Sequence, residues 1–149
     1  MRNWVAAGLG LAVAAGCAST PEAAIESDAE AFMWGYTEAW NRHDTQSLAA
    51  NYWAMTPSVE EEKARLDATF KQMVDQGYAR STIHEIKSCP TGENTAWAGM
   101  KFTRFLTDGE VMGPRDRASE YGLTWKDDRG WRITSIGGSD ASKPLECPS

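Results

Sequence analysis

The chain has 149 residues, a length that fits one domain rather than two. Its 21 acidic residues outnumber the 15 lysines and arginines, and the formal net charge of −6 argues against nucleic acid as a partner. The longest acidic run is Glu60–Glu62, so the charge is typical of a solvated surface rather than of an acidic tail. Seven tryptophans indicate a core or a pocket that covers them.

Residues 1–16 predict an export signal. After Arg2 no charged residue occurs before Cys17, and this apolar stretch is too short to span a bilayer. Ala14–Cys17 resembles the signal of bacterial lipoproteins, which is cut before an acylated cysteine. The resemblance implies that Cys17 is lipidated, with palmitate-like chains that anchor the protein stably. Ala18 replaces the aspartate of inner-membrane retention, so we expect the outer membrane, facing the periplasm. The alternative is an ordinary secretory signal.

Export would place the two remaining cysteines in an oxidising compartment. Cys89 and Cys147 then form an even pair, which favours a disulfide, with two free thiols as the alternative. Cys89 lies in the segment SCPTGEN, whose proline and glycine indicate a turn. We therefore do not interpret it as a catalytic thiol.

Residues 17–27 are small and polar and are predicted to form a flexible tether. A first helix is expected to begin at Ser27, because Ser27 and Glu30 have the spacing of a capping box. Apolar residues at helical spacing then form one stripe: Phe32, Tyr36, Ala39 and Trp40.

Two further helices are predicted after the segment NRHD. Asp44 can cap a short second helix. Ser58 opens a third with a second Ser-x-x-Glu box, and Gly77 ends it. The apolar stripe of this third helix consists of Leu66, Phe70, Met73 and Val74.

After Tyr78 the hydrophobic period changes to that of strands. Four are predicted: Thr82–Ser88, Thr95–Leu106, Arg117–Lys126 and Trp131–Ile136. Short turns between them predict an antiparallel meander, and three preceding helices on one face predict the α+β class. In the second strand the face toward the helices should carry Ala96, Ala98, Met100, Phe102, Arg104 and Leu106.

The segments FMWGYTEAWNRHDTQSLAANYW and YGLTWKDDRGWRITSI resemble the nuclear transport factor 2-like superfamily, which includes ketosteroid isomerase, SnoaL-like cyclases and scytalone dehydratase. The resemblance covers residues 28–137, and we expect the domain to comprise residues 28–138 and to be followed by a C-terminal tail, 139–149. It implies a cone-like α+β fold in which three N-terminal helices pack on a curved antiparallel sheet. We expect the sheet to curl around the helix Ser58 to Gln76 and to leave a hollow that binds small apolar molecules.

Enzymes of this superfamily place a base opposite hydrogen-bond donors that stabilise an enolate. The candidate donors here are Tyr36 and Tyr121, and the candidate base is His84, which as an alternative is a hydrogen-bonded structural histidine. Arg104 is unusual on an apolar strand face, and either Glu38, Glu120 or a ligand carboxylate should meet it. The expected ligand-binding residues are Tyr36, Trp40, Trp53, His84, Arg104 and Tyr121.

Three functions follow from these residues. We favour a periplasmic lipoprotein that binds a small apolar ligand or a partner protein without catalysis. The alternative is a lyase, isomerase or cyclase that acts on a hydrophobic carbonyl compound by proton transfer through His84. A third is a homodimer or an envelope scaffold that uses the sheet face with Trp97 and Phe105. We expect no cofactor or metal, because His43 and His84 lie in different elements and no phosphate-binding glycine loop occurs.

Overall fold

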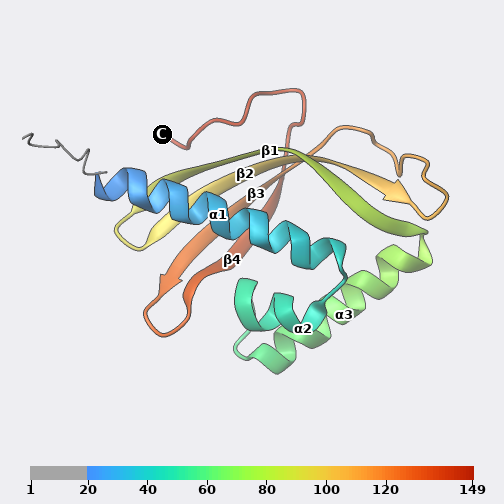
Figure 1. The fold of residues 1–149 in the computed structure, drawn as a ribbon, viewed down its shortest axis with the longest axis horizontal. Coiled ribbons are helices and arrows are strands. Elements are labelled where there is room, and N and C mark those ends of the chain that lie inside the picture. Colours follow the sequence, from blue (N-terminus) through green and yellow to red (C-terminus); the bar gives the residue numbers. More distant parts are fainter. Residues whose placement is uncertain (1–19) are drawn as a thin grey trace, which may run out of the picture.

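The computed structural model describes residues 20–149 (Figure 1). The predicted signal peptide, 1–16, and the lipidation site Cys17 lie outside this part. The described elements are the helices α1 (Pro21–Asn41), α2 (Thr45–Ser47) and α3 (Val59–Asp75), the π-helical turn η1 (Leu48–Tyr52), and the strands β1 (Tyr78–Gly92), β2 (Thr95–Leu106), β3 (Arg117–Lys126) and β4 (Gly130–Ser139). None of the helices in residues 20–149 is both long and apolar enough to cross a membrane.

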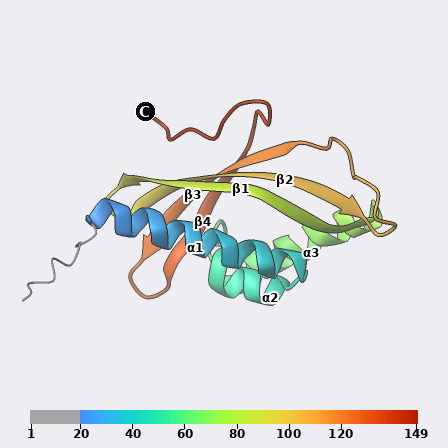
Figure 2. The same ribbon diagram turned by 45° about the horizontal axis from the view of Figure 1, so that its top comes forward.

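The four strands form one antiparallel sheet in the order β1-β2-β3-β4. Figure 2 shows the helices on one face of this sheet and the C-terminal segment on the other. The predicted meander and the α+β class are therefore confirmed. The sheet packs mainly on α1, whereas α3 contacts η1 and β1. The expectation that the sheet curls around the helix Ser58 to Gln76 was wrong, because α1 is longer and carries the buried stripe Ala29, Met33, Tyr36 and Ala39.

Helix α1 begins at Pro21, earlier than the Ser27 box predicts. Proline is compatible with the first turn of a helix, where its missing N–H group needs no partner. Ile25 packs against the core, and the Glu26 carbonyl accepts a hydrogen bond of 2.7 Å from the Ser88 hydroxyl. Residues 21–27 are thus helix rather than flexible tether, because this turn has a strand to pack against.

Helix α3 has the predicted ends. The Ser58 hydroxyl accepts a hydrogen bond of 3.2 Å from the Glu61 N–H group, as in a capping box. Gly77 follows the helix with a φ of +87°, a conformation that glycine adopts without strain. Val74 is 47% exposed, so it does not continue the buried stripe as predicted.

Strands β2 and β3 have the predicted bounds, and β1 contains an irregularity that the sequence pattern did not reveal. Ile83 pairs with Phe102 and Glu85 pairs with Lys101, so His84 is an extra residue in a β-bulge. The bulge shifts the alternation of side chains in β1. As a result, the His84 side chain does not share a face with Ile86.

The outer face of the sheet is covered in part by residues 140–149. Cys147 forms a disulfide with Cys89, the pairing that the sequence favoured, with Cα atoms 5.8 Å apart. Leu145 is buried, and its carbonyl accepts a hydrogen bond of 3.2 Å from the Lys87 ammonium group. The Trp97 ring lies over Gly99, beside Leu145. The chain's own tail therefore covers the surface that we expected at Trp97, and a homodimer stays a prediction.

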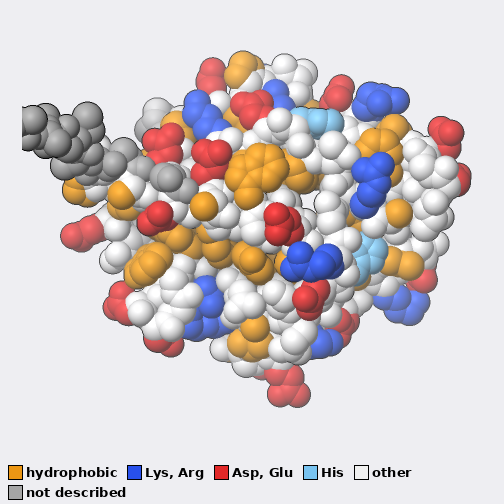
Figure 3. Space-filling model, viewed as in Figure 1, with side chains coloured by type: hydrophobic (Ala, Val, Ile, Leu, Met, Phe, Trp, Pro, Cys, Tyr) orange, Lys and Arg blue, Asp and Glu red, His pale blue; other side chains and the backbone are white. Residues whose placement is uncertain are grey.

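The surface on the side of α1 has no large region of one charge. Figure 3 shows acidic and basic side chains interspersed there, with hydrophobic side chains between them. Mixed charges of this kind are typical of a solvated surface. Exposed hydrophobic residues include Trp34 on α1 and Trp125 at the end of β3, both 42% exposed.

Candidate ligand-binding site

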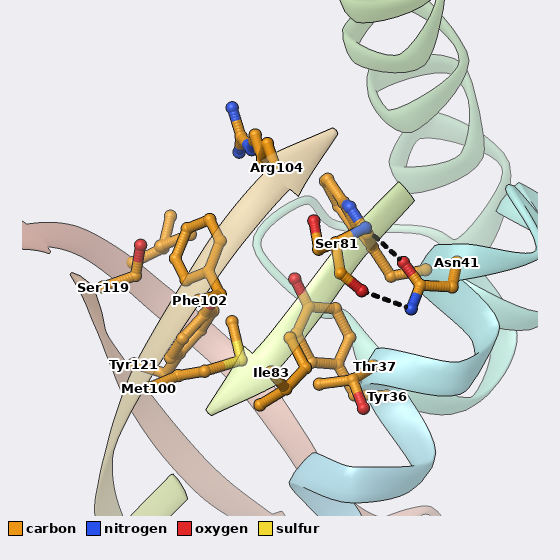
Figure 4. A pocket seen from close by; sticks show the side chains of 12 residues that line it. Tyr36, Thr37, Asn41, Ser81, Ile83, Met100, Phe102, Arg104, Ser119 and Tyr121 are labelled. Atoms are coloured by element: carbon orange, nitrogen blue, oxygen red, sulfur yellow. Dashed lines mark hydrogen bonds between the residues drawn. The ribbon is translucent and has the colours of Figure 1, made fainter. Parts of the chain in front are cut away.

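A small pocket lies between the C-terminal half of α1 and the inner face of the sheet (Figure 4). Its volume is about 50 Å³. Aromatic rings pack closely around the predicted hollow: the Tyr36 ring centroid lies 5.7 Å from those of both Trp53 and Tyr121. The lining consists of Tyr36, Thr37, Trp40, Asn41, Ser81, Ile83, Met100, Phe102, Arg104, Ser119, Tyr121 and Ile136.

The rings of Tyr36 and Tyr121 form a T-shaped pair in this lining, with their centroids 5.7 Å apart. Burial, followed by the neighbouring phenol of Tyr121, raises the pKa of Tyr36 well above its ordinary value. Burial likewise raises the pKa of Tyr121 to about 12, although the neighbouring hydroxyl groups of Tyr36 and Ser119 oppose the shift. Both phenols are therefore neutral near neutral pH and can donate hydrogen bonds.

One wall of the pocket is fixed by a clamp between α1 and β1. The Asn41 amide donates to the Ser81 carbonyl over 2.9 Å and accepts from the Ser81 N–H group over 2.8 Å (Figure 4). The Trp40 indole donates to the Tyr78 hydroxyl over 3.0 Å, and that hydroxyl lies 2.8 Å from the Ser81 hydroxyl. The bonds made by Trp40 and Asn41 join residues far apart in the sequence, so they hold the end of the helix rigidly against the strand.

Arg104 lies at one end of the pocket (Figure 4). Its Nε is buried without a hydrogen-bond partner, and its guanidinium lies over the rings of Tyr78, at 5.8 Å, and Phe102, at 5.5 Å. The salt bridges among residues 20–149 do not include Arg104. The internal ion pair expected with Glu38 or Glu120 is absent in this part of the chain: Glu38 is exposed, and Glu120 accepts a hydrogen bond from Ser139.

Two of the predicted binding residues lie outside the pocket. Trp53 is 2% exposed and belongs to the core, with the Arg65 guanidinium 4.9 Å above its ring. His84 is exposed on the outer face, and its Nε2 lies 2.7 Å from the Thr103 hydroxyl oxygen. The assignment of His84 as a base in the pocket was wrong because the bulge in β1 turns it to the other face. The pocket brings together the other four: Tyr36, Trp40, Arg104 and Tyr121.

Several lining residues were not singled out from the sequence. Ile83 faces the pocket because of the same bulge, and Ser119 faces it because it pairs with Met100 across β2 and β3. Asn41 lies in a segment on which the family resemblance rests, and nothing else in the sequence indicated that it lines the pocket. Within residues 20–149, no Asp, Glu or His lines the pocket. In the same range, no group of three or more His, Cys, Asp or Glu could hold a metal ion.

A bent antiparallel meander closed on one face by a long helix, with a pocket between them, is the cone arrangement of nuclear transport factor 2-like proteins (Figures 1 and 2). The chain has this fold. No protein-family model matches it, and no curated protein matches its sequence.

Solved structures support the assignment of the fold. The chain is similar to Aln2 from a Streptomyces species, with 15% identity, a TM-score of 0.57, and coverage of 80% of this chain and 91% of that one. An NTF-2-like protein of unknown function from Shewanella oneidensis has 23% identity, a TM-score of 0.53, and coverage of 76% and 98%. A domain of unknown function with a cystatin-like fold from Nostoc punctiforme has 20% identity, a TM-score of 0.56, and coverage of 76% and 75%. Identities this low show the fold and not the activity.

Proposed function

We propose that this domain binds a small, mostly apolar molecule in the pocket between α1 and the sheet, without a chemical step. The observation that carries the proposal is the lining: apolar and aromatic side chains with a few neutral hydrogen-bonding groups and, within residues 20–149, no acid or histidine. Such a lining is typical of ligand sites. Proton abstraction next to a carbonyl needs a base within hydrogen-bond reach. The lining offers donors and an apolar surface but no such base.

The tyrosine pair favours one alternative, a lyase, isomerase or cyclase that acts on a hydrophobic carbonyl compound. Two buried neutral phenols could donate hydrogen bonds to a developing enolate. His84, the base that the sequence suggested, is exposed on the opposite face of the sheet. The alternative would therefore need a base supplied by the substrate or by water, and binding alone needs no further group.

We also propose that the protein is exported and anchored to the outer membrane through Cys17, with the domain in the periplasm. The N-terminal pattern and the disulfide between Cys89 and Cys147 support this location, because disulfides persist in oxidising compartments. Since α1 begins at Pro21, the chain from Cys17 to the helix would span at most about 14 Å. Such a short connection would hold the domain next to the membrane surface.

Ligand binding is tested by titrating the isotope-labelled protein with hexanamide, which has a short apolar chain and a neutral head. We expect the NMR signals of the Trp40 indole and of the Ile83 methyl groups to shift in a saturable way. Ile83→Phe should abolish these shifts by filling the pocket, because Ile83 lines it. Val74→Phe adds the same ring on an exposed position of α3 and should leave binding unchanged. Equal binding by both variants would place the hexanamide site elsewhere.

A further inference from the structure

A wider basin adjoins the pocket at the end where Arg104 lies. Phe102, Arg104 and Ser119 line both spaces, and the basin has a volume of about 780 Å³. Its charged lining consists of three arginines and two aspartates: Arg104, Arg115, Arg117, Asp116 and Asp140. A positive excess here contrasts with the net charge of −6 of the whole chain.

Arg104 and Arg117 lie on the inner face of neighbouring strands. Arg117 is the Cα partner of Phe102, and Arg104 lies two residues further along β2 on the same face. The Nε atom of each is buried without a hydrogen-bond partner. Burial, followed by the charge of Arg104, lowers the pKa of Arg117, so the two guanidinium groups repel each other. Holding two like charges together is unfavourable unless an anion compensates them.

Only one of the two guanidinium groups is free to bind. A terminal nitrogen of Arg117 donates to the backbone carbonyls of Met112 and Gly113 and so fixes the loop that follows β2. Arg104 has no side-chain hydrogen bond or ion pair with any of the residues 20–149, and its guanidinium lies over the Tyr78 and Phe102 rings. Asp140 does not compensate it, because its carboxylate accepts hydrogen bonds from Ser142 and lies 4.0 Å from the Lys143 ammonium group.

We propose that Arg104 binds the acidic head of the ligand, so that the pocket takes a small amphipathic carboxylate rather than a neutral molecule. The planar guanidinium matches a carboxylate with two parallel hydrogen bonds, and Arg117 adds positive potential behind it. The apolar part of the ligand lies in the pocket beside Ile83 and Met100. Because the pocket has a volume of only about 50 Å³, only the end of a longer chain lies there, and the rest lies in the basin beside Phe102. The inference rests on the proposed ligand-binding function.

The experiment compares hexanoate with hexanamide, which has the same chain and a neutral head of similar shape. Titrations of the full chain followed by NMR should show that hexanoate binds about tenfold more tightly, since hydrogen bonds to charged groups are the stronger ones. In Arg104→Met the affinity for hexanoate should fall about tenfold. Hexanamide affinity should stay within about twofold, and the preference for the acid should therefore disappear.

Arg80→Met is the matched control, because it removes one positive charge from the outer face of β1, where Arg80 lies over the Phe105 ring. It should keep the preference for hexanoate. Equal binding of both probes by the unchanged protein would overturn this inference and leave the proposed function standing. Binding of neither probe would overturn both. A preference that survives Arg104→Met would remove Arg104 from the site.

Discussion

Tyr36 of α1 and Tyr121 of β3 meet inside the pocket, where their rings form a T-shaped pair with centroids 5.7 Å apart. Each residue is 3% exposed. The pair therefore joins the helix to the middle of the sheet and at the same time supplies polar groups to the pocket. Burial disfavours the charged phenolate form of both side chains. The stability of the fold should therefore depend on pH in the alkaline range.

We predict that the free energy of unfolding decreases as the pH rises above about 10. The pKa of Tyr121 is raised to about 12, so between these two values the unfolded chain releases a proton that the folded chain retains. Stability is fully present below the ordinary tyrosine pKa and is lost as the pH approaches the folded value. Urea denaturation at a series of alkaline pH values measures this slope.

Tyr121→Phe should make that slope smaller, because one of the late-titrating groups is removed. The phenolate absorbance of the unchanged folded protein should also rise at higher pH than that of the urea-unfolded chain. An identical alkaline slope in Tyr121→Phe and the unchanged protein would assign the pH dependence to other groups.

Glu62 provides a second link between charge and stability. This carboxylate is 1% exposed and accepts hydrogen bonds of 2.8 Å from the N–H groups of Met55 and Thr56 and 2.8 Å from Nε of Arg65. Burial alone would raise its pKa, but the hydrogen bonds from Arg65 and Thr56 hold the pKa below the ordinary value. Glu62 thus ties the loop before α3 to the helix.

We predict that Glu62→Gln lowers the free energy of unfolding by about 2 kcal/mol at neutral pH, the size expected for hydrogen bonds to a charged group. A lowered pKa means that this stability is present above the ordinary glutamate pKa and is lost as the pH falls through the folded value. The difference between variant and unchanged protein should therefore shrink in acid. Glu60→Gln, on an exposed position of the same turn, should change stability by less than about 0.5 kcal/mol. A similar loss in both variants would contradict this role.

The sequence shows Glu60, Glu61 and Glu62 as equivalent members of an acidic run. Glu62 is the buried one because the preceding loop packs against it. No local sequence pattern specifies how that loop packs. The Ser58 box was predicted correctly, whereas the similar box at Ser27 lies within a helix. The difference is that Ile25 finds a tertiary contact, which outweighs a local capping signal.

Strand periodicity correctly predicted the inner face of β2, where Ala96, Ala98, Met100 and Phe102 are buried. It also predicted that Arg104 lies on this apolar face, which is unusual for an arginine. The same period misplaced His84, because a single bulge residue reverses the alternation beyond it. Tyr36 and Tyr121 were found as candidates through a family resemblance, not through their spacing. The contact between their rings depends on how α1 crosses the sheet, which is a tertiary property.

We predict that the disulfide between Cys89 and Cys147 stabilises the fold by about 4 kcal/mol, the value expected when it closes a sequence separation of 58 residues. Cys147→Ser should also release Leu145 from the outer face. Urea denaturation with and without a reductant measures the loss. Reductant should destabilise the unchanged protein but should have no further effect on Cys147→Ser. A reduced protein as stable as the oxidised one would show that the tail docks without the bridge.

The final prediction concerns Arg104 and Arg132, two arginines that should respond in opposite directions to the same substitution. Arg132 is 7% exposed, and its guanidinium donates to the carbonyls of Ala50, Arg129 and Trp131. Arg132→Met should lower the free energy of unfolding by about 2 kcal/mol, because these carbonyls lose their donor. Arg104 has no such acceptor among residues 20–149, so the burial of its Nε is a cost without hydrogen-bond compensation.

Arg104→Met should therefore raise the free energy of unfolding, by about 1 kcal/mol, even though the same change removes the proposed carboxylate contact. Residues that serve binding often lower stability, and denaturation of the two variants side by side measures the sign of the change. Destabilisation by Arg104→Met would mean that the contacts with the Tyr78 and Phe102 rings outweigh desolvation. Arg104 would then be a structural residue, and the case for an acidic ligand would lose its main support.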